Sequence, residues 1–183
     1  MSKLSFKSKS GFTIIEVVLV LAIAGLIFMM VFIALPALQR SQRDTRRSDD
    51  VSRLQTALNN YQASNRGAIP TKAGGLVTRK IGSNAEGDKE WASFYNRYLL
   101  VNAGGQTDTF EDPDGTPYSL EIKQAVSGSV PQAKDKTFKD QEHKILIVTN
   151  AVCEGENIKY SSGSRKVAMA YKKEGGGTIC VNN

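Results

Sequence analysis

The sequence contains few of the residues from which catalytic and metal sites are usually built. Among its 183 residues there is one histidine, His143, and there are two cysteines. A Ser-His-Asp triad would depend on that single histidine with no supporting motif, and the chain has no Cys/His zinc spacing. Because His143 lies in the polar segment KDQEHK, we expect it to be exposed and without a functional role. We therefore expect no enzyme activity, no metal and no cofactor.

Acidic residues are missing from the start of the chain. The first eleven residues contain Lys3, Lys7 and Lys9 but no Asp or Glu, while the formal net charge of the whole chain is +6. Removing these three from the 24 basic residues leaves 21 against 18 acidic ones, a net charge of +3. So small a charge leaves nucleic acid open as a partner but does not indicate one.

Residues 12–38 contain almost no polar side chains. They read FTIIEVVLVLAIAGLIFMMVFIALPAL, in which one threonine, one glutamate and one proline are the exceptions. A helix needs about 20 apolar residues to cross a membrane core of roughly 30 Å, so the segment is long enough. A secretory signal peptide is the alternative, but its apolar core is usually about 7–15 residues long and precedes the cleavage site. Here the small residues Ser10 and Gly11 come first, so a cut beside them would leave the helix on the mature protein.

Basic residues flank the apolar segment on both sides. The lysines before it favour a cytoplasmic N-terminus, because cytoplasmic flanks of membrane helices are enriched in Lys and Arg. Four arginines after it favour the opposite orientation: Arg40, Arg43, Arg46 and Arg47. The charges by themselves leave the orientation open.

Glu16 is the only acidic residue of the apolar segment. A carboxylate at the centre of a membrane helix costs about 2–3 kcal/mol, and less near the headgroups, so such a residue usually has a function. Glu16 could simply reach the headgroups. It could instead pair with the amine that cleavage after Gly11 would free on Phe12, because opposite charges attract strongly in a medium of low dielectric constant. An amine from a neighbouring copy would then set the axial register of a polymer.

Residues 11–16, GFTIIE, resemble the cleavage motif of type IV pilins and type II secretion pseudopilins. The resemblance implies that a membrane-embedded aspartyl prepilin peptidase cuts after Gly11 and methylates the new N-terminal residue, Phe12. It implies a role for Glu16 in subunit recruitment and register, and a cytoplasmic N-terminus before processing. Gly11 has a physical reason as well, because a residue without a side chain lets the peptidase approach the backbone.

Two helix-breaking residues lie in the apolar segment. Gly25 costs about 1 kcal/mol relative to alanine inside a helix, and Pro36 removes one helix hydrogen bond. Membrane helices tolerate both residues, so packing in the membrane is one explanation. The family resemblance implies another, in which the chain between Gly25 and Pro36 unwinds in the filament.

Residues 39–66 are predicted to continue the helix as an amphipathic half. No residue from 39 to 50 is apolar, and after them apolar residues recur at helical spacing: Val51, Leu54, Ala57, Leu58 and Tyr61. This stripe predicts packing on a globular head. The sequence Asn65-Arg66-Gly67, followed by Pro70, predicts the end of the helix. A single helix over residues 12–65 would be about 80 Å long, which suits a shaft better than a compact enzyme.

Residues 67–183 are predicted to form the head. Alternating or continuous apolar patterns predict strands at 119–125, 144–152, 167–171 and 178–181, with a short helix at 90–100. Three glycines at 175–177 predict a hairpin loop between the last two strands. The predicted fold class is therefore α+β: a long N-terminal α-helix, half transmembrane and half amphipathic, packed on a small antiparallel β-sheet head as in type IV pilins.

Residues 110–118 read FEDPDGTPY, a cluster of turn-forming residues. The cluster resembles the DPxGxPY turn of major pseudopilins and some related pilins. Asp112 and Asp114 raise the question of a calcium site, but the further ligands and the glycine spacing of an EF-hand loop are missing. We interpret the segment as a turn without a metal.

Cys153 and Cys180 are the two cysteines, and both lie near the C-terminus. In an exported head they would tend to oxidise to a disulfide, worth roughly 3–4 kcal/mol through chain entropy. The family commonly has such a bond in its C-terminal region. Two unpaired, buried thiols are the alternative.

The sequence as a whole predicts the structural subunit of a type IV pilus, with roles in adhesion, twitching motility or DNA uptake. Its parts would be a leader peptide (1–11), a transmembrane and assembly half-helix (12–38), an amphipathic half-helix (39–66) and a head with a C-terminal disulfide region (67–183). The protein would cross the cytoplasmic membrane once, with its head outside the cytoplasm, and later enter an extracellular filament. The implied partners are prepilin peptidase, other copies of the chain, an inner-membrane assembly platform and a cytoplasmic assembly ATPase, since the chain has no P-loop.

Two alternatives to a pilus subunit stay open. One is a major pseudopilin of a type II secretion system, which the turn at 110–118 favours, whereas the cysteine pair favours a pilus. The other is a membrane-tethered surface domain or enzyme that does not polymerise. Such a tether needs neither Glu16 in its apolar helix nor a processing site before it.

Overall fold

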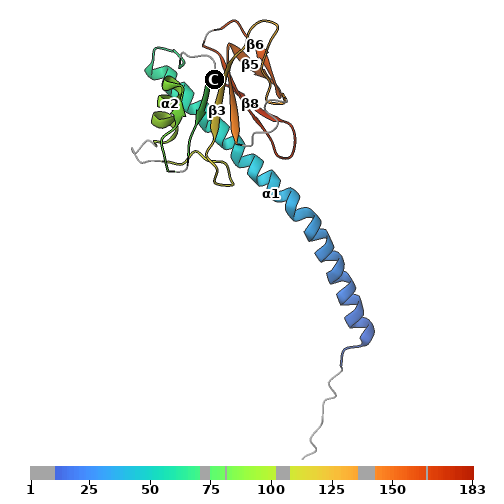
Figure 1. The fold of residues 1–183 in the computed structure, drawn as a ribbon. Coiled ribbons are helices and arrows are strands. Elements are labelled where there is room, and N and C mark those ends of the chain that lie inside the picture. The colour runs from blue at the N-terminus through green and yellow to red at the C-terminus, as the bar shows by residue number, and fades with distance from the viewer. Residues whose placement is uncertain (1–10, 71–74, 81, 102–107, 136–142, 164) are drawn as a thin grey trace, which may run out of the picture. The chain divides into compact units, whose positions relative to one another are not determined.

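The computed structural model describes residues 11–70, 75–80, 82–101, 108–135, 143–163 and 165–183 (Figure 1). The chain divides into two compact units, one ending at Arg40 and the other beginning at Ser41. Of the predicted leader, only Gly11 belongs to the described residues; Lys3, Lys7 and Lys9 lie outside them.

Helix α1 spans Ile14–Ser64 and contributes to both units. It ends where the sequence predicts, because Arg66 and Gly67 adopt positive φ angles of 55° and 79°. The Gly67 amide donates back to the carbonyl of Gln62 at 2.7 Å, which satisfies one of the carbonyls left open at a helix C-terminus. The predicted stripe of the amphipathic half faces the head, with Val51, Leu54, Ala57 and Leu58 buried and Tyr61 half-buried.

The head contains a six-stranded sheet in the order β2-β1-β3-β4-β7-β8. Its strands are β1 (Gly75–Thr78), β2 (Glu86–Gly87), β3 (Ser119–Gln124), β4 (Lys144–Thr149), β7 (Val167–Lys172) and β8 (Thr178–Asn182). The α+β class is confirmed, and four of the strands are those that the sequence predicts. The two strands β1 and β2 are additional, and both are too short to give a clear alternating pattern.

The sheet is mixed and not wholly antiparallel. Strands β3 and β4 run parallel, pairing Leu120 with Ile145 and Ile122 with Ile147, while every other pair in this sheet is antiparallel. Parallel neighbours need a crossover connection, and the chain between β3 and β4 provides one. Side-chain alternation along a strand is the same in both directions, so it does not reveal strand direction.

The predicted strand at 144–152 is two strands. β4 ends at Thr149, Asn150 takes a φ of 57°, and β5 (Ala151–Glu154) leaves to pair with β6 (Asn157–Tyr160) in a separate two-stranded sheet. Asparagine tolerates this left-handed conformation better than most residues, so the apolar run can turn a corner at that point. The result is a hairpin, β5–β6, outside the main sheet (Figure 1).

The predicted helix at 90–100 is also divided. Helix α2 (Lys89–Phe94) is followed directly by a π-helical turn, η1 (Tyr95–Leu99). The Asp88 side chain caps α2 by accepting the amides of Glu90 and Trp91. Trp91, Phe94 and Tyr95 are fully buried in the main core.

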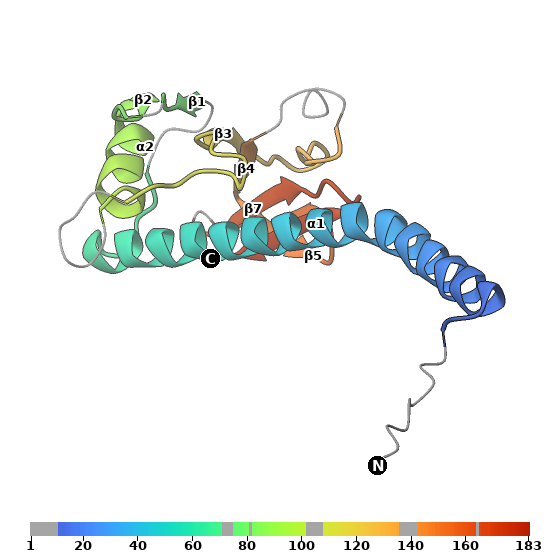
Figure 2. The same cartoon turned by 90° about the horizontal axis from the view of Figure 1, so that it is seen from below.

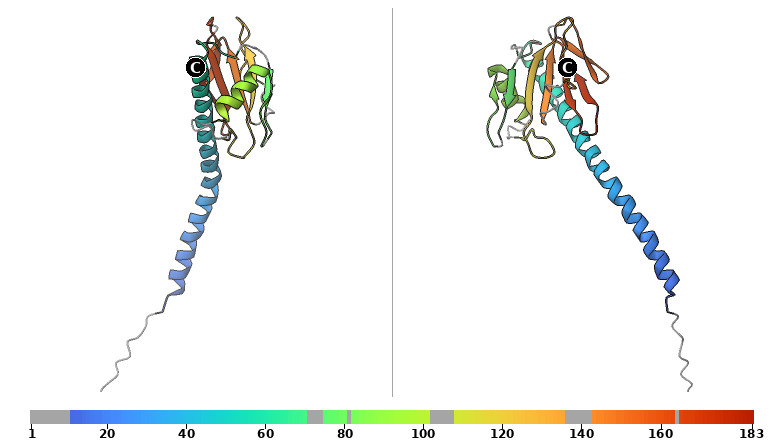
Figure 3. Two further views of the ribbon diagram at one scale, coloured as in Figure 1. Left: turned by 90° about the vertical axis from the view of Figure 1, so that its left-hand side faces the viewer. Right: turned by 45° about the vertical axis from the view of Figure 1, so that its right-hand side comes forward.

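The two faces of the main sheet are covered by different elements. Ile145, Ile147 and Met169 belong to the main core, which packs against residues 51–61 of α1 and against α2 (Figures 2 and 3). Leu146 and Val148, which alternate with them, belong to a smaller cluster that includes Ile158 of the hairpin. Strand β4 is therefore buried on both faces, which explains its unbroken apolar run.

Candidate functional site

The predicted processing site lies just before α1. Gly11, Phe12 and Thr13 precede the first helical residue, and all three are exposed, Phe12 to 86%. A Cβ added to Gly11 would meet nothing within 4 Å. The fold of this single chain therefore does not require glycine at position 11, so a requirement for glycine would have to come from a partner that binds the segment.

Thr13 defines where the helix begins. Its hydroxyl accepts the backbone N–H of Glu16 at 3.3 Å, and its carbonyl accepts that of Val17 at 3.3 Å. Thr13 is thus the N-cap and Glu16 the third helical residue, the spacing of a capping box. The motif T-x-x-E before an apolar run could have revealed this role, which sequence analysis missed.

Glu16 lies in the first turn of α1 and is exposed. A carboxylate is favoured there because the helix macrodipole places a partial positive charge at the N-terminus. No ion pair within the described part of the chain includes Glu16. Its carboxylate is therefore open to a partner from outside the chain.

The apolar half of α1 exposes its side chains on all sides. From Phe12 to Leu38, the exposed fractions of the large apolar side chains run from 44% at Leu35 to 86% at Phe12. Gly25 and Pro36 both lie within the helix, and a Cβ at Gly25 would meet nothing within 4 Å. Among the described residues, α1 is the one helix long and apolar enough to cross a membrane.

A buried ion pair in the head joins α1 to the 110–118 turn. Arg47 donates from Nε to Oδ2 of Asp112 at 2.6 Å and from Nη2 to Oδ1 at 2.9 Å. Asp112 is 2% exposed and Arg47 7% exposed. Two parallel bonds between a guanidinium and a carboxylate are among the strongest polar contacts in proteins. The predicted turn at Asp112–Gly115 is present, and its first residue also anchors the helix.

The loop between β7 and β8 is tied to the same part of α1. Asp44 accepts the backbone amides of Glu174 and Gly175 at 2.9 and 3.0 Å, and Arg43 forms two hydrogen bonds to the Glu174 carboxylate.

The arginines lower the pKa values of the two carboxylates that they contact. Burial by itself would raise the pKa of Asp112, but Arg47 outweighs burial and holds that pKa below its ordinary value of 3.8. The hydrogen bond from Arg43 lowers the pKa of Glu174 to about 2. Both carboxylates therefore stay ionised at neutral pH.

The expectation that His143 is exposed is wrong. Its side chain is 17% exposed, with Nε2 3.2 Å from Oδ2 of Asp114 and Nδ1 3.7 Å from Oδ1 of Asp112. The ligand atoms of these three residues lie within 4.8 Å of one another, close enough to hold a metal ion. Both oxygens of Asp112 already accept hydrogen bonds from Arg47, however. We call the linked ion pairs and hydrogen bonds of Arg43, Asp44, Arg47, Asp112 and Glu174 the charge network. The cluster around His143 belongs to this network, which anchors α1.

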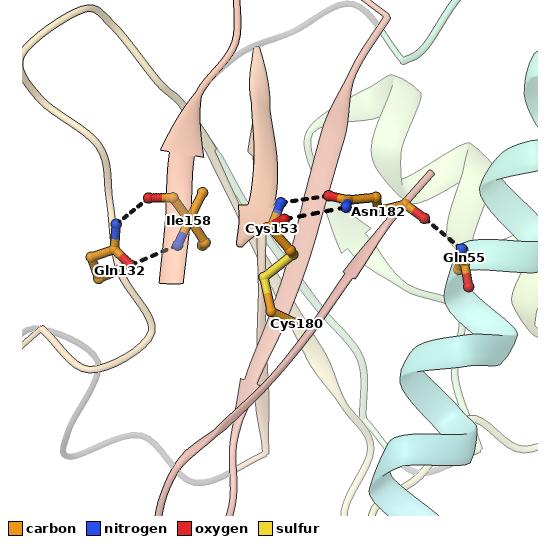
Figure 4. Close-up of a disulfide and its surroundings, with 6 residues drawn as sticks. All are labelled: Gln55, Gln132, Cys153, Ile158, Cys180 and Asn182. Atoms are coloured by element: carbon orange, nitrogen blue, oxygen red, sulfur yellow. Dashed lines mark hydrogen bonds between the residues drawn. A yellow bond between two sulfur atoms is a disulfide. The ribbon is translucent and has the colours of Figure 1, made fainter. Parts of the chain in front are cut away.

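Cys153 of β5 and Cys180 of β8 form a disulfide, with their Cα atoms 5.7 Å apart (Figure 4). The Asn182 side chain accepts the Cys153 amide at 2.5 Å and donates to the Cys153 carbonyl at 3.5 Å. On the other edge of the hairpin, Gln132 accepts the Ile158 amide at 2.9 Å and donates to its carbonyl at 2.6 Å. Side-chain amides thus replace a neighbouring strand on both edges.

Comparison with known proteins places one motif on the chain. Residues 6–32 match the family model described as the prokaryotic N-terminal methylation motif, the prepilin signal of type IV pilins and pseudopilins. No curated protein and no solved structure was found to be similar to the chain. The motif supports a pilin-like or pseudopilin protein that is anchored in a membrane, processed by a peptidase and assembled into pilus-like filaments.

Proposed function

We propose that this chain is the structural subunit of a type IV pilus. Prepilin peptidase cuts after Gly11 and methylates Phe12, and the mature chain polymerises through α1 into an extracellular filament. Before assembly the chain spans the cytoplasmic membrane once, with its head outside the cytoplasm. An inner-membrane platform and a cytoplasmic ATPase assemble the subunits.

One observation carries this proposal: the first half of α1 is apolar on every side, yet its first turn holds an exposed carboxylate. A plain membrane anchor does not need Glu16, because a carboxylate is costly in hydrocarbon and the Thr13 hydroxyl already caps the helix. A polymer gains a specific contact, since each cleaved chain brings a new amine on Phe12. That amine and the Glu16 of a neighbouring copy attract strongly where water is excluded. The apolar surfaces around them then bury one another in the filament.

A second candidate is the major pseudopilin of a type II secretion system. The 110–118 turn favours it, because FEDPDGTPY resembles the turn of major pseudopilins. Loss of surface fibres on deletion of the gene would support the pilus, whereas loss of protein secretion with intact fibres would support the pseudopilin. A chain that remains in the membrane without entering any fibre would contradict both.

The test is electron microscopy of sheared surface fibres, combined with mass spectrometry of their main subunit. We expect a subunit that begins at a methylated Phe12. The variant Glu16→Ala should be processed and inserted in the membrane but absent from fibres. Glu86→Ala, the same change at an exposed glutamate of the head, is the matched control and should assemble normally. Normal fibres from Glu16→Ala would overturn the proposed role of Glu16 in assembly, and fibres that lack this chain altogether would overturn the proposed pilus subunit.

A further inference from the structure

A pocket in the head is lined by none of the residues that form the charge network around Arg47 and Asp112. It has a volume of about 320 Å³ and is lined by residues of the C-terminal end of α1, of α2 and of η1. Volumes near 300 Å³ are at the lower end for ligand sites, so the pocket suits a small ligand. Nothing in the proposed assembly through residues 12–38 uses this part of the head.

Three aromatic rings form one wall of the pocket. Phe94 is fully buried and stacks on Tyr98 with the ring centroids 5.7 Å apart and the planes at 22°. Tyr61 meets both rings edge-on, at 5.7 Å from Phe94 and 5.5 Å from Tyr98. Tyr61 and Tyr98 are only half-buried, so part of each ring faces the opening. Mutual packing fixes the rings in place before any ligand arrives.

The other walls carry polar groups that the described residues leave unused. Lys89, Ser93 and Arg97 are exposed, and none of them forms a hydrogen bond or ion pair within the described part of the chain. The same holds for the hydroxyls of Tyr61 and Tyr98. Other arginines of the head, among them Arg43, Arg47 and Arg79, are paired with acids. The pocket is thus lined with hydrogen-bond donors that a ligand with acceptor atoms could bind.

The net charge of the lining is positive. Two cations, Lys89 and Arg97, stand against one carboxylate, Glu90. An anion is therefore favoured over a cation in this space. The guanidinium of Arg97 can bind a carboxylate through two parallel hydrogen bonds, whereas Lys89 offers a point charge.

Two of the lining residues lie at an irregularity of the helix. Arg97 and Tyr98 belong to η1, where the backbone widens into a π-helical turn. Such turns are rare and occur frequently at functional sites. Here the turn presents Arg97 and Tyr98 beside Phe94, so the cation and the aromatic wall share one edge of the pocket.

We propose that this pocket binds an anionic monosaccharide unit, a hexuronic acid. The C–H face of the sugar ring packs on the exposed parts of Tyr61 and Tyr98. The carboxylate of the sugar accepts hydrogen bonds from Arg97 and Lys89. Its hydroxyls bond to Ser93, to Glu90 and to the tyrosine hydroxyls. The head of this protein would thereby recognise an acidic polysaccharide one sugar at a time.

Isothermal titration calorimetry of the full chain in detergent micelles tests the proposal, with sodium glucuronate as the probe. Glucose and inorganic phosphate are the matched controls. Glucose has the sugar ring but no negative charge, and phosphate has the negative charge but no sugar ring. We expect glucuronate to bind at least about tenfold more tightly than either, since charge-assisted hydrogen bonds contribute about 1.5–3 kcal/mol each. The single tryptophan, Trp91, whose ring is 5.6 Å from that of Phe94, should report binding by a change in fluorescence.

Arg97→Gln should weaken glucuronate binding by at least about tenfold and leave the near-ultraviolet circular dichroism unchanged. Arg46→Gln, at an exposed arginine of α1 outside the pocket, should bind as the parent does. If Arg97→Gln disturbs the fold, Lys89→Gln takes its place. Equal affinity for phosphate would mean an adventitious anion site only and would overturn the proposal. So would equal affinity for glucose, absence of binding, or equal binding by both arginine variants. Binding is measured without filaments, so its failure leaves the assembly proposal untouched.

Discussion

Glu16 has two functions at the residue scale, one within its own chain and one proposed between chains. Its amide completes the N-cap that Thr13 provides, and its carboxylate occupies the third helical position, where the macrodipole favours an anion. The capping geometry starts the helix at Ile14, so the bond between Gly11 and Phe12 stays outside it. The same residues therefore keep the proposed processing site accessible and place the carboxylate four residues from the N-terminus that the proposed cleavage would create.

Gly11→Val should block processing, because a branched side chain at the cleavage site prevents the peptidase from approaching the backbone. The unprocessed chain would run as an unshifted band in gel electrophoresis, and its intact mass would still include the leader. Gly11→Ala should be partly tolerated, since alanine is small.

Gly25→Val is the matched control for this prediction. Gly25 is also a glycine of the N-terminal segment with no neighbour near its Cβ position, but it lies inside the helix. Processing of Gly25→Val should be normal. Complete processing of Gly11→Val would contradict the assigned cleavage site.

Arg47→Met should destabilise the head by about 3–5 kcal/mol, because it leaves the buried Asp112 carboxylate without its partner. The free energy of unfolding can be measured by denaturant titration of the full chain in detergent, followed by near-ultraviolet circular dichroism. The double variant Arg47→Met/Asp112→Leu should recover most of the loss, since apolar replacement of a buried pair is often neutral.

Arg46→Met controls for the loss of an arginine from the same helix. Its side chain is exposed, so its effect should stay within about 0.5 kcal/mol. A loss no larger in Arg47→Met than in Arg46→Met would show that the pair contributes little to stability.

At the scale of elements, the β5–β6 hairpin depends on a few specific ties. Cys153 and Ile158 are opposite one another in the hairpin, and Asn182 and Gln132 clamp these two residues from either side. The disulfide to β8 acts at the same position, and Ile158 packs into the smaller cluster beneath. A two-stranded ribbon is only marginally stable alone, so these ties decide whether it stays on the sheet.

Replacing both cysteines by alanine should destabilise the head by roughly 2–4 kcal/mol, because the unfolded chain regains the entropy of an open loop. Hydrogen exchange should become faster in β5 and β6 than in β3, which lies in the middle of the main sheet. The single variant Asn182→Ala keeps the disulfide and separates its effect from that of the clamp. Uniform acceleration across the head would contradict a local role for the bond.

At the scale of the whole molecule, the charge network joins α1, the 110–118 turn and the β7–β8 loop within the head. Asp112 and Glu174 both have a pKa below the ordinary value, owing chiefly to Arg47 and Arg43. A carboxyl group whose pKa is lower in the folded protein than in the unfolded chain stabilises the folded state. This stabilisation is fully present at pH values above the unfolded pKa, and it is lost as the pH falls through the folded pKa. The network therefore holds at neutral pH and fails in acid.

We expect the free energy of unfolding of the head to fall as the pH drops below about 4.5, the ordinary pKa of Glu174, toward 2. The double variant Arg47→Met/Asp112→Leu should show a shallower fall, because the Asp112 contribution is absent. Asp50, whose pKa burial raises, acts in the opposite direction but is present in both proteins. Parallel stability curves for the two proteins between pH 5 and 2 would contradict the assignment.

Prediction from sequence succeeded where the signal is periodic or local. The apolar run, the stripe from Val51 to Tyr61 and the turn at Asp112 each depend on neighbours in the sequence, as does the helix end at Gly67. It failed where distant residues decide: His143 is drawn into the charge network, and Asn150 turns one expected strand into two. Arg47 and Tyr171, which bond to the buried Asp112, are 65 and 59 residues away from it along the chain, so no local sequence pattern predicts these contacts.

The sequence by itself determined the features of the N-terminal segment. These are the motif at residues 11–16, a helix whose apolar surface requires an apolar environment, and one acidic residue, Glu16, within that helix. Those features follow from composition and spacing along one helix, which need no folded partner. Only the tertiary structure decided the parallel pairing of β3 with β4, the anchoring of α1 by Asp112 and the aromatic pocket beside η1. Each of these is a contact between segments far apart in the chain, and its free energy exists only once the head has closed around it.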